Sequence, residues 1–597
     1  MRLLFLQLPR LDPDVTSPGE NLMPAAACLR AALERSPESP HWSVIETPES
    51  QNELADAALA DRLAALRPDA LSATCYLWNV ERTLHLLRLI KKRLPALKIV
   101  LGGPDIAVRH PLLPEIPPLS SALRPPSSVL RPLSSALPPP SSALRFPADA
   151  LVVGEGETVF PDVLRFFRTG RAPAFNGVRW RTPDGTFAEG SRRRPVMPLQ
   201  ELLPAPDHPI NRPDAFGMAY LETNRGCPMR CAFCCYNLRR STTTCLPPDE
   251  VAARIRILRR RGAKEIRLTD PTFNAHPRFD EILGVLAREN RDRKLAFFVE
   301  IRADTLTDDQ ARRLAAAGVA EAEVGIQSTD PAVLRLLHRP LNADRVLRGI
   351  EALLRHGIKP TLDFMYALPA QDEQDIQRSL DWLARFGDAI HPQFLPTLLL
   401  PGTELRDRAA ELGIRAQRLP PYRVQATDKL SARRLRQVEA WANERLGGFD
   451  SPTQRFVGAR LPDLFPCRVR VRLPPGPLPT AYSLQPSDSR QAVILAGEDL
   501  FAQREALADF VRGSVRAEPH ILWQFVLEPT EEEPLDLFDF LIAAFAKLPG
   551  HWLDRLVSPP GERRLCARRL LVKLPRGKRF DPSWREDAES LLAQHFH

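Results

Sequence analysis

The chain has 597 residues, of which 44% are hydrophobic and 26% are charged, as in ordinary globular proteins. At about 150 residues per domain, this length predicts three or four folding units. No apolar run approaches the roughly 20 residues that span a bilayer, and the apolar start is too short for a signal peptide, so we expect a cytoplasmic protein without a membrane partner. The net charge of +9 is spread thinly, which favours a solvated surface over nucleic-acid binding.

Residues 1–170 alternate apolar runs with amphipathic segments, a pattern typical of a parallel α/β sheet. Strands are expected at residues 2–8, 42–46, 70–74, 98–101 and 148–153. Helices are expected between them, at about residues 25–34, 52–66 and 80–94. In such a sheet ligands bind beyond the carboxyl ends of the strands, so residues at these ends are candidate binding residues.

Three groups of candidate residues follow the third, fourth and fifth expected strands. They are Ser72, Thr74 and Trp78, then Gly102 and Gly103, then Gly154, Glu155 and Gly156. Glycine lets a backbone approach a bulky ligand closely, although a glycine after a strand can equally form an ordinary turn.

An insertion at residues 111–147 interrupts this unit. Ser-Ser-x-Leu units recur in it every seven residues, but prolines between the units forbid a continuous helix. We expect a disordered or polyproline-like, solvent-facing segment without a catalytic role.

Three cysteines, Cys227, Cys231 and Cys234, follow the next strand-like run with C-x3-C-x2-C spacing. A [4Fe–4S] cube normally takes one cysteine on each iron, so three thiolates from one loop leave one iron open for a ligand. A structural zinc site would need a fourth ligand, which could come from Cys235 or Cys245, but Cys235 is hard to aim at the same ion because it adjoins Cys234. A redox pair of Cys231 and Cys234 would leave Cys227 without a role. The spacing therefore favours an iron–sulfur cluster.

Strand–helix alternation resumes from about residue 216, at the spacing of a (β/α) barrel. Strands are expected at residues 220–223, 265–269, 295–301, 322–326, 361–367 and 393–397. Functional residues of such barrels follow the strands at the carboxyl face. The polar candidates there are Asp270 and Asn274, then Glu300 and Arg302, then Gln327 and Ser328.

The last 150 residues form another expected unit. Strands are expected at residues 468–473, 491–495, 521–527 and 570–574, with helices near 502–513 and 534–548. We assign 1–170 to an N-terminal domain, 171–215 to a linker, 216–445 to the barrel, and 446–597 to a small α+β domain of unknown role.

The cysteine run resembles the cluster loop of the radical S-adenosylmethionine (radical SAM) enzymes. Gly-Gly-Pro after the fourth strand and Gly-Glu-Gly-Glu after the fifth resemble the cobalamin-binding domain that precedes the barrel in one large group of these enzymes. The resemblance implies a Rossmann-like, doubly wound cobalamin domain followed by an incomplete (β/α)6 barrel. It also implies three cofactors: a [4Fe–4S] cluster, SAM and cobalamin. No D-x-H-x-x-G histidine is present in the sequence, so the cobalamin would be bound base-off.

The resemblance also implies roles for the candidate residues. Glu300, with Gln327 or Ser328, would contact the SAM ribose, and Arg302 would pair with the methionine carboxylate. Asp270 and Asn274 would lie near the SAM amino group, although the usual Gly-Gly-Glu is absent. Trp78 would either crowd the lower corrin face or be an ordinary core aromatic.

The predicted function is methylation of an unactivated carbon on an unknown small-molecule or peptide substrate, with an electron donor such as flavodoxin or ferredoxin. The alternative within this class is a cobalamin-dependent cyclase or rearrangement enzyme. An RNA methylthiotransferase would need three further cysteines upstream, where the sequence has only Cys28 and Cys75. A non-enzymatic cobalamin or cluster sensor is the remaining alternative. No catalytic side chain is assigned from the sequence.

Overall fold

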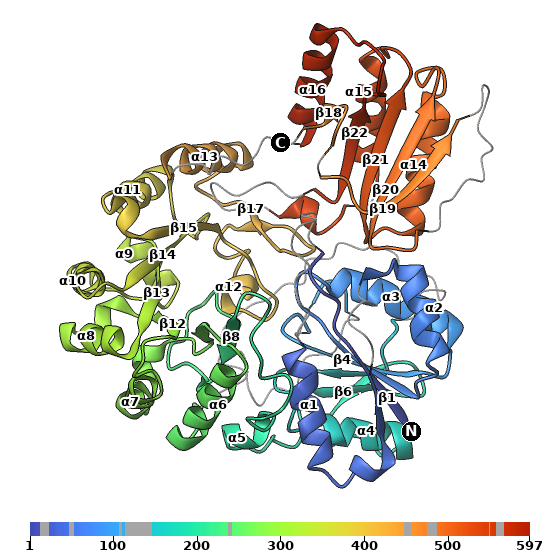
Figure 1. Cartoon of the computed structure of the whole chain (residues 1–597). Helices are drawn as coiled ribbons and strands as arrows, with labels where there is room; N and C mark the ends of the chain where they lie inside the picture. The colour runs from blue at the N-terminus through green and yellow to red at the C-terminus, as the bar shows by residue number, and fades with distance from the viewer. Residues whose placement is uncertain are drawn as a thin grey trace.

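The computed structural model describes residues 1–11, 23–46, 53–106, 110–113, 146–236, 242–446, 455–461, 463–473, 486–548, 550–556 and 566–596. Three lobes, each built on its own largely or wholly parallel sheet, make up the structure (Figure 1). Most of the Pro/Ser-rich insertion expected at 111–147 lies outside the described residues. Among the helices within these ranges, none is both long and apolar enough to cross a membrane.

The N-terminal lobe contains a seven-stranded sheet with the order β2-β1-β3-β4-β5-β6-β7. Its parallel strands are β1 (Arg2–Leu6), β2 (Ser43–Ile45), β3 (Ala70–Thr74), β4 (Lys98–Gly102) and β5 (Ala150–Val152). The order 2-1-3-4-5 is that of flavodoxin-like doubly wound folds, whose ligands bind at the carboxyl ends of the strands. The five predicted strands and the parallel sheet are therefore confirmed.

Helices cover both faces of this sheet, as the doubly wound prediction requires. They are α1 (Pro24–Glu34), α2 (Asp56–Ala65), α3 (Val80–Arg93) and α4 (Phe160–Thr169). Leu59 of α2 and Leu87 of α3 pack in one apolar cluster with Leu4 of β1, whereas Leu33 of α1 and Phe160 of α4 pack in another. Alternate residues of the strands point to opposite faces, so each face buries its own cluster.

The expected linker at 171–215 is partly sheet, which corrects the sequence-based assignment. β6 (Val178–Arg181) pairs antiparallel with β5, and β7 (Phe187–Glu189) pairs antiparallel with β6. These strands do not form apolar runs because they contain charged residues. Arg179, for example, is buried and pairs with Glu189 at 2.7 Å.

The middle lobe contains a six-stranded, all-parallel sheet with the order β15-β14-β13-β12-β11-β8. Its strands are β8 (Met218–Leu221), β11 (Glu265–Leu268), β12 (Ala296–Ile301), β13 (Val319–Gln327), β14 (Lys359–Tyr366) and β15 (His391–Pro396). The α-helices between them are α6 (Pro248–Arg260), α7 (Phe279–Glu289), α8 (Asp308–Ala317), α9 (Pro331–Leu336), α10 (Ala343–Arg355) and α11 (Glu373–Ala384). β8 and β15 are sheet edges, so the six predicted strands form an open barrel.

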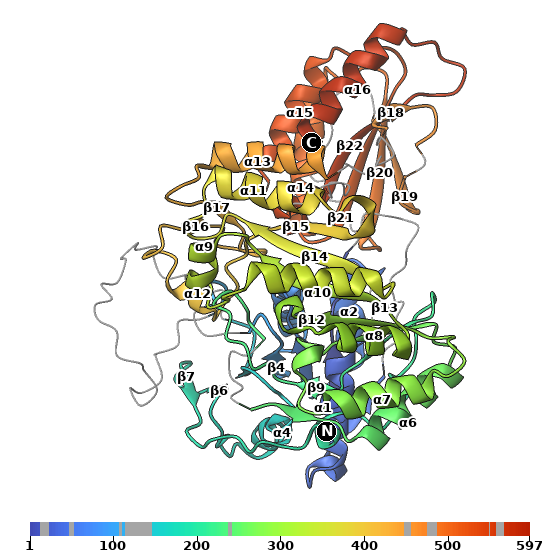
Figure 2. The same cartoon turned by 90° about the vertical axis from the view of Figure 1, so that its left-hand side faces the viewer.

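The C-terminal lobe contains a five-stranded sheet with the order β18-β22-β21-β20-β19 (Figure 2). The strands are β18 (Val457–Gly458), β19 (Cys467–Arg472), β20 (Arg490–Gly497), β21 (Leu522–Pro529) and β22 (Arg568–Lys573). Its helices are α14 (Arg504–Ala517), α15 (Asp536–Ala546) and α16 (Pro582–Phe596). All its strand pairs are parallel, so the predicted α+β class is wrong and this lobe is α/β. Helix α14 connects β20 to β21 and helix α15 lies between β21 and β22, as parallel pairing requires, and the fully buried β21 has the apolar run of a parallel strand.

Candidate functional site

The cysteine loop begins just beyond the first barrel strand. Asn224–Arg225, as β9, pairs antiparallel with β10 (Thr244–Cys245), and the three cysteines lie in the loop between them. Gly226 opens the loop with φ +107°, and a Cβ there would lie 2.9 Å from the carbonyl oxygen of Thr242. Only glycine accommodates that backbone conformation and that contact without strain.

Asp270, which follows β11, holds the root of this loop. Its Oδ1 accepts hydrogen bonds from the backbone N–H groups of Thr223 and Asn224 at 2.8 and 3.0 Å, and its Oδ2 lies against the Thr223 hydroxyl. The side chain is fully buried, and this burial raises its pKa from 3.8 to about 7. These partners give Asp270 a structural role, while its predicted contact with the SAM amino group stays a prediction.

The three cysteines have polar neighbours. Cys227 Sγ lies 3.6 Å from Thr272 Oγ1, Arg339 donates to Cys231 Sγ at 3.4 Å, and the Tyr236 N–H donates to Cys234 Sγ at 3.4 Å. Desolvation by the surrounding protein, followed by the neighbouring cysteines, raises the pKa of the partly exposed Cys234 thiol to about 11.

This donor set fits an iron–sulfur cluster. Three thiols on one loop, with hydrogen-bond donors near the sulfurs, are the ligands and the tuning groups that such clusters use. Within the described ranges, no three His, Cys, Asp or Glu side chains converge closely enough to hold a single metal ion. A [4Fe–4S] cluster does not require such convergence, because each thiolate binds a different iron.

Arg302 lies beside the cysteine loop. Its guanidinium donates to Asp304 at 2.9 and 2.7 Å and approaches the Met229 sulfur at 3.8 Å. The Asn274 side chain accepts from the Arg302 N–H at 2.9 Å and donates to its carbonyl at 2.8 Å. Asn274 thus braces Arg302, whose predicted pairing with the methionine carboxylate remains untested.

Carboxyl groups gather on the barrel side of neighbouring strands. Glu300 of β12 pairs in register with Glu323 of β13, and Asp363 of β14 pairs with Gly325 of β13. Burial and then Glu323 raise the pKa of Glu300 to about 7, and the same causes raise that of Asp363 well above its ordinary value. The centre of the barrel is therefore acidic and partly desolvated.

Gln327 and Ser328 occupy different environments at the end of β13. Gln327 has φ +69° and is 8% exposed, and its Oε1 has no hydrogen-bond partner among the described residues. A buried amide oxygen without a partner is costly in a folded protein, and a ligand hydroxyl would satisfy it. Ser328 instead accepts from the Asp330 N–H at 3.1 Å, next to the start of α9 (Pro331–Leu336). Gln327 therefore fits the predicted ribose contact better than Ser328.

The glycines at the carboxyl edge of the N-terminal sheet differ in how much space a side chain would have at each position. Gly103 has φ +107°, and a Cβ there would lie 2.4 Å from the Cys75 carbonyl, so it serves a backbone contact. Within the part of the chain that the structure describes, a Cβ on Gly102 would meet only the Val152 carbonyl oxygen, at 3.8 Å. Gly154 has φ +85°, and a Cβ on Gly156 would lie 2.8 Å from the Leu29 side chain. Gly102 is thus the position with open space above the sheet edge.

The other predicted residues at this edge lie on or just after β3. Ser72 and Thr74 are buried at 6% and 8% exposure. Trp78 stacks on Tyr76 at 4.4 Å between ring centroids and packs against an apolar cluster that includes Leu522 of the C-terminal lobe. This packing supports the core interpretation of Trp78, and its contact with a corrin stays a prediction.

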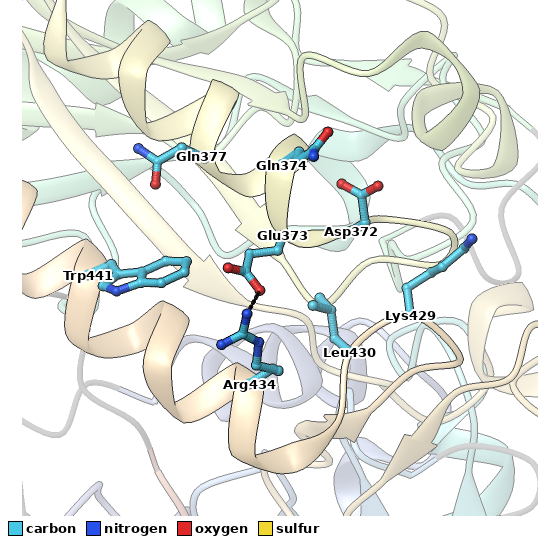
Figure 3. A pocket seen from close by; sticks show the side chains of 8 residues that line it. All are labelled: Asp372, Glu373, Gln374, Gln377, Lys429, Leu430, Arg434 and Trp441. Carbon is cyan, nitrogen blue, oxygen red and sulfur yellow. Dashed lines mark ion pairs between the residues drawn. The ribbon is translucent and has the colours of Figure 1, made fainter.

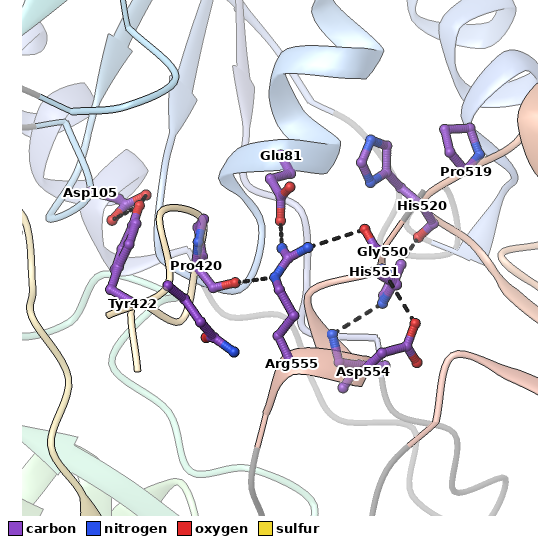
Figure 4. A network of polar contacts seen from close by, with 12 residues as sticks. Glu81, Asp105, Pro420, Tyr422, Pro519, His520, Gly550, His551, Asp554 and Arg555 are labelled. Atoms are coloured by element: carbon purple, nitrogen blue, oxygen red, sulfur yellow. Dashed lines mark hydrogen bonds and ion pairs between the residues drawn. The ribbon is translucent and has the colours of Figure 1, made fainter. Parts of the chain in front are cut away.

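Two polar contacts bring the carboxyl edges of the first two lobes together. Tyr422 donates to both oxygens of Asp105 at 3.1 and 3.0 Å, as Figure 4 shows, and His110 lies 2.9 Å from the same carboxylate. Arg225, two residues before Cys227, pairs with Glu157 at 2.8 Å. The loops after β4 and β5 therefore lie against the barrel loops that carry the cysteines and Tyr422.

The sequence did not indicate several of these contacts. Arg339 follows α9 and Thr272 lies beyond β11, and neither belongs to a motif. Only the fold brings them to the cysteines, so no local signal could have identified them.

A pocket between α11 and α13 (Ala432–Arg445) contains none of the predicted residues (Figure 3). Its lining includes Gln377, Lys429, Trp441 and the 2.7 Å ion pair of Glu373 with Arg434. We assign it no role.

Residues 221–383 match the family model of the Radical SAM superfamily, so the chain carries a radical SAM domain. The matched segment begins at the last residue of β8 and ends in α11, and it includes the cysteine loop and the four barrel strands β11 to β14. The resemblance noted from the cysteine spacing is therefore confirmed.

The chain is also similar to two named methyltransferases, one of which is described as cobalamin-dependent. The 2-(S-pantetheinyl)-carbapenam-3-carboxylate methyltransferase of Streptantibioticus cattleyicolor is 28% identical over 238 residues, which are 37% of this chain and 30% of that protein. The cobalamin-dependent radical SAM methyltransferase TokK of Streptomyces tokunonensis is 22% identical over 369 residues, or 59% of this chain and 50% of that protein. The matches thus span half or less of the length of these two relatives.

The fold is also that of a solved enzyme. The radical SAM methyltransferase TsrM from Kitasatospora setae, whose structure has cobalamin and a [4Fe–4S] cluster bound, superimposes with a TM-score of 0.51 at 16% identity. The match covers 70% of this chain and 77% of that chain.

Proposed function

We propose that this protein is a cobalamin-dependent radical SAM methyltransferase. One observation carries the proposal: the carboxyl edge of the barrel sheet, which bears the three-cysteine loop, lies against the carboxyl edge of the N-terminal sheet, which has the flavodoxin-like strand order. Cobalamin and SAM would then lie between the N-terminal lobe and the barrel. The relatives named above support the assignment, because two of them are described as using cobalamin or as having it bound.

The chain's own residues would hold and orient the cofactors. Cys227, Cys231 and Cys234 would bind the cluster, Arg302 would pair with the methionine carboxylate, and Gln327 would accept from the ribose. The groups themselves supply the electron transfer, radical formation and methyl carriage when bound. The loops after β4 and β5, which contact the barrel loops through Asp105 and Glu157, would help to exclude water from bound cofactors.

The domain assignment is part of the proposal, with one change. The cobalamin-binding domain extends to the end of β7 at Glu189, and the linker to the barrel follows it. The substrate would be a small molecule or a peptide that reaches the junction of the two edges, and an external reductant would supply the electron.

The alternative functions receive less support. An RNA methylthiotransferase would need a second cluster, but Cys28 and Cys75, the cysteines that precede the loop, are buried at 7% and 0% exposure on different elements. A cyclase would use the same three cofactors, and nothing in the described residues favours it over a methyltransferase.

A labelling experiment tests the proposal. Anaerobically reconstituted protein should bind cobalamin at about one per chain, and it should carry about four irons if a cube is present. A host grown on methionine with a deuterated methyl group should then contain a labelled product that a gene-deleted host lacks. Protein that cleaves SAM but binds no cobalamin would rule out this methyl carrier, and the proposal would be abandoned.

A further inference from the structure

Arg225 lies at the centre of a four-residue charge network next to the cysteine loop. Its Nε and Nη2 donate to the two oxygens of Glu222 at 2.7 and 2.8 Å, and its Nη1 lies 2.8 Å from Glu157 and 3.4 Å from Glu155. The Arg225 side chain is only 16% exposed. The bidentate pair with Glu222 fixes the plane of the guanidinium, which leaves Nη1 directed at the other two carboxylates.

Two of the three carboxylates belong to the other lobe. Glu155 and Glu157 lie in the loop between β5 and α4, at the carboxyl edge of the N-terminal sheet. The Glu155 carbonyl also accepts from Arg194 at 2.5 Å. This loop is therefore anchored on its own side and reaches Arg225 with side chains alone.

Carboxylates of both lobes share Arg225. Glu222 pairs with it from the same segment, whereas Glu155 and Glu157 approach its Nη1 from the N-terminal lobe. A partly buried pair is screened less by salt than a surface pair, so the attraction acts strongly on the loop geometry. Small movements of either loop would separate these charges.

Other contacts also hold the lobes together. Arg555 of the C-terminal lobe pairs with Glu81 of α3 and donates to the Pro420 carbonyl at 2.6 Å, close to the bond between Tyr422 and Asp105 (Figure 4). Docking therefore does not depend on Arg225. What distinguishes Arg225 is its position, two residues before the first cluster cysteine.

We propose that Arg225 and Glu157 are positioning residues that fix the distance between the cluster loop and the cobalamin edge. Methyl and electron transfer both depend steeply on the separation of the reacting groups, so this distance bears directly on catalysis. The inference rests on the proposed function for the identity of the two cofactors. The contact between the lobes is independent of that function.

A pair of variants with a matched control tests the role. Glu157→Gln removes one charge with little change in shape. Arg225→Glu combined with Glu157→Arg and Glu222→Gln exchanges the charges across the contact and removes the carboxylate that would repel the new acidic side chain. Glu38→Gln is the control, because Glu38 is 7% exposed and pairs with Arg168 at 2.9 and 3.0 Å within one lobe.

The main measurement is the dipolar coupling between the reduced cluster and cob(II)alamin, determined by pulsed electron paramagnetic resonance. We expect one narrow distance distribution in the wild type and in Glu38→Gln, a broadened one in Glu157→Gln, and recovery in the charge-exchanged variant. Iron and cobalamin contents should stay unchanged in all four proteins. An unaltered distribution in Glu157→Gln, or no recovery in a charge-exchanged variant that retains both cofactors, would overturn the proposal.

Deuterium uptake provides a measurement that needs no cobalamin. Peptides covering residues 153–159 and 226–236 should exchange about threefold faster in Glu157→Gln than in wild type, since losing the pair favours local opening. Uptake in Glu38→Gln should match wild type for these peptides. Equal uptake in Glu157→Gln would refute the positioning role, whereas absence of cobalamin binding would refute only the proposed function.

Discussion

Asp270 is a buried carboxyl group whose surroundings favour the protonated form. It is fully buried, and this burial raises its pKa from 3.8 to about 7. Its Oδ1 accepts from the N–H groups of Thr223 and Asn224, and its Oδ2 lies against the Thr223 hydroxyl. In Asp270→Asn the amide oxygen can take the place of Oδ1 and the amide nitrogen can face the hydroxyl. The variant therefore mimics the protonated acid at every pH.

The sign of the pH effect follows from the raised pKa. Between about pH 4 and pH 7 the folded state holds a proton that the unfolded chain has released, so the wild type loses stability as the pH rises through this range. Each pKa unit corresponds to about 1.4 kcal/mol, and from pH 5 to pH 8 the loss comes to about 3 kcal/mol. Asparagine does not titrate and avoids this loss.

Anaerobic urea unfolding at several pH values measures the difference. Relative to wild type, the free energy of unfolding of Asp270→Asn should rise by about 3 kcal/mol between pH 5 and pH 8. Asp270→Ala is the control: it leaves two N–H groups and a hydroxyl without an acceptor, at about 1–3 kcal/mol each, so it should be destabilised throughout this pH range. If Asp270→Asn and wild type show parallel pH profiles, Asp270 does not titrate as argued here.

Further variants test the site. Alanine in place of Cys227, Cys231 or Cys234 should abolish iron binding and SAM cleavage, whereas Cys235→Ala should retain both. Zinc instead of iron in the anaerobically purified protein would contradict the cluster assignment. Gly102→Val should weaken hydroxocobalamin binding in equilibrium dialysis with iron content unchanged, and wild-type affinity in this variant would place the corrin elsewhere. Gly103→Val should instead lower stability, because its Cβ would meet the Cys75 backbone. Arg339→Gln should make the cluster harder to reduce in a redox titration, since a positive charge near Cys231 stabilises the reduced, more negative cluster; an unchanged potential would exclude that role.

Much of the fold could be predicted because its core strands are apolar runs between amphipathic helices. The short β6 and β7 could not, since Arg179 is buried through an ion pair with Glu189 that a hydropathy pattern does not reveal. The direction of strand pairing in the C-terminal lobe was also missed. Apolar alternation identifies a strand but not its neighbour's direction, although the continuous apolar run of β21 was a usable signal for a parallel sheet.

The site was predictable where a motif carried it and not where the fold assembled it. The cysteine spacing identified the cluster loop because three ligands lie within eight residues of the sequence. Thr272 and Arg339, which approach Cys227 and Cys231, come from different barrel units. Their contacts depend on how strand ends meet at the carboxyl face, which residue spacing does not encode.

The Gly-Glu-Gly-Glu segment contacts the Arg-Gly-Cys segment of the cysteine loop. Its glycines were interpreted as ligand contacts, but a Cβ on Gly156 would meet Leu29, and Glu157 pairs with Arg225. Arg225 in turn begins the Arg-Gly-Cys segment, 68 residues further along the chain. Arg225 pairs with Glu222 of its own segment and also with Glu155 and Glu157 of the first motif, so this arginine joins the two motifs. The two motifs therefore act together to set how the N-terminal sheet meets the cluster loop.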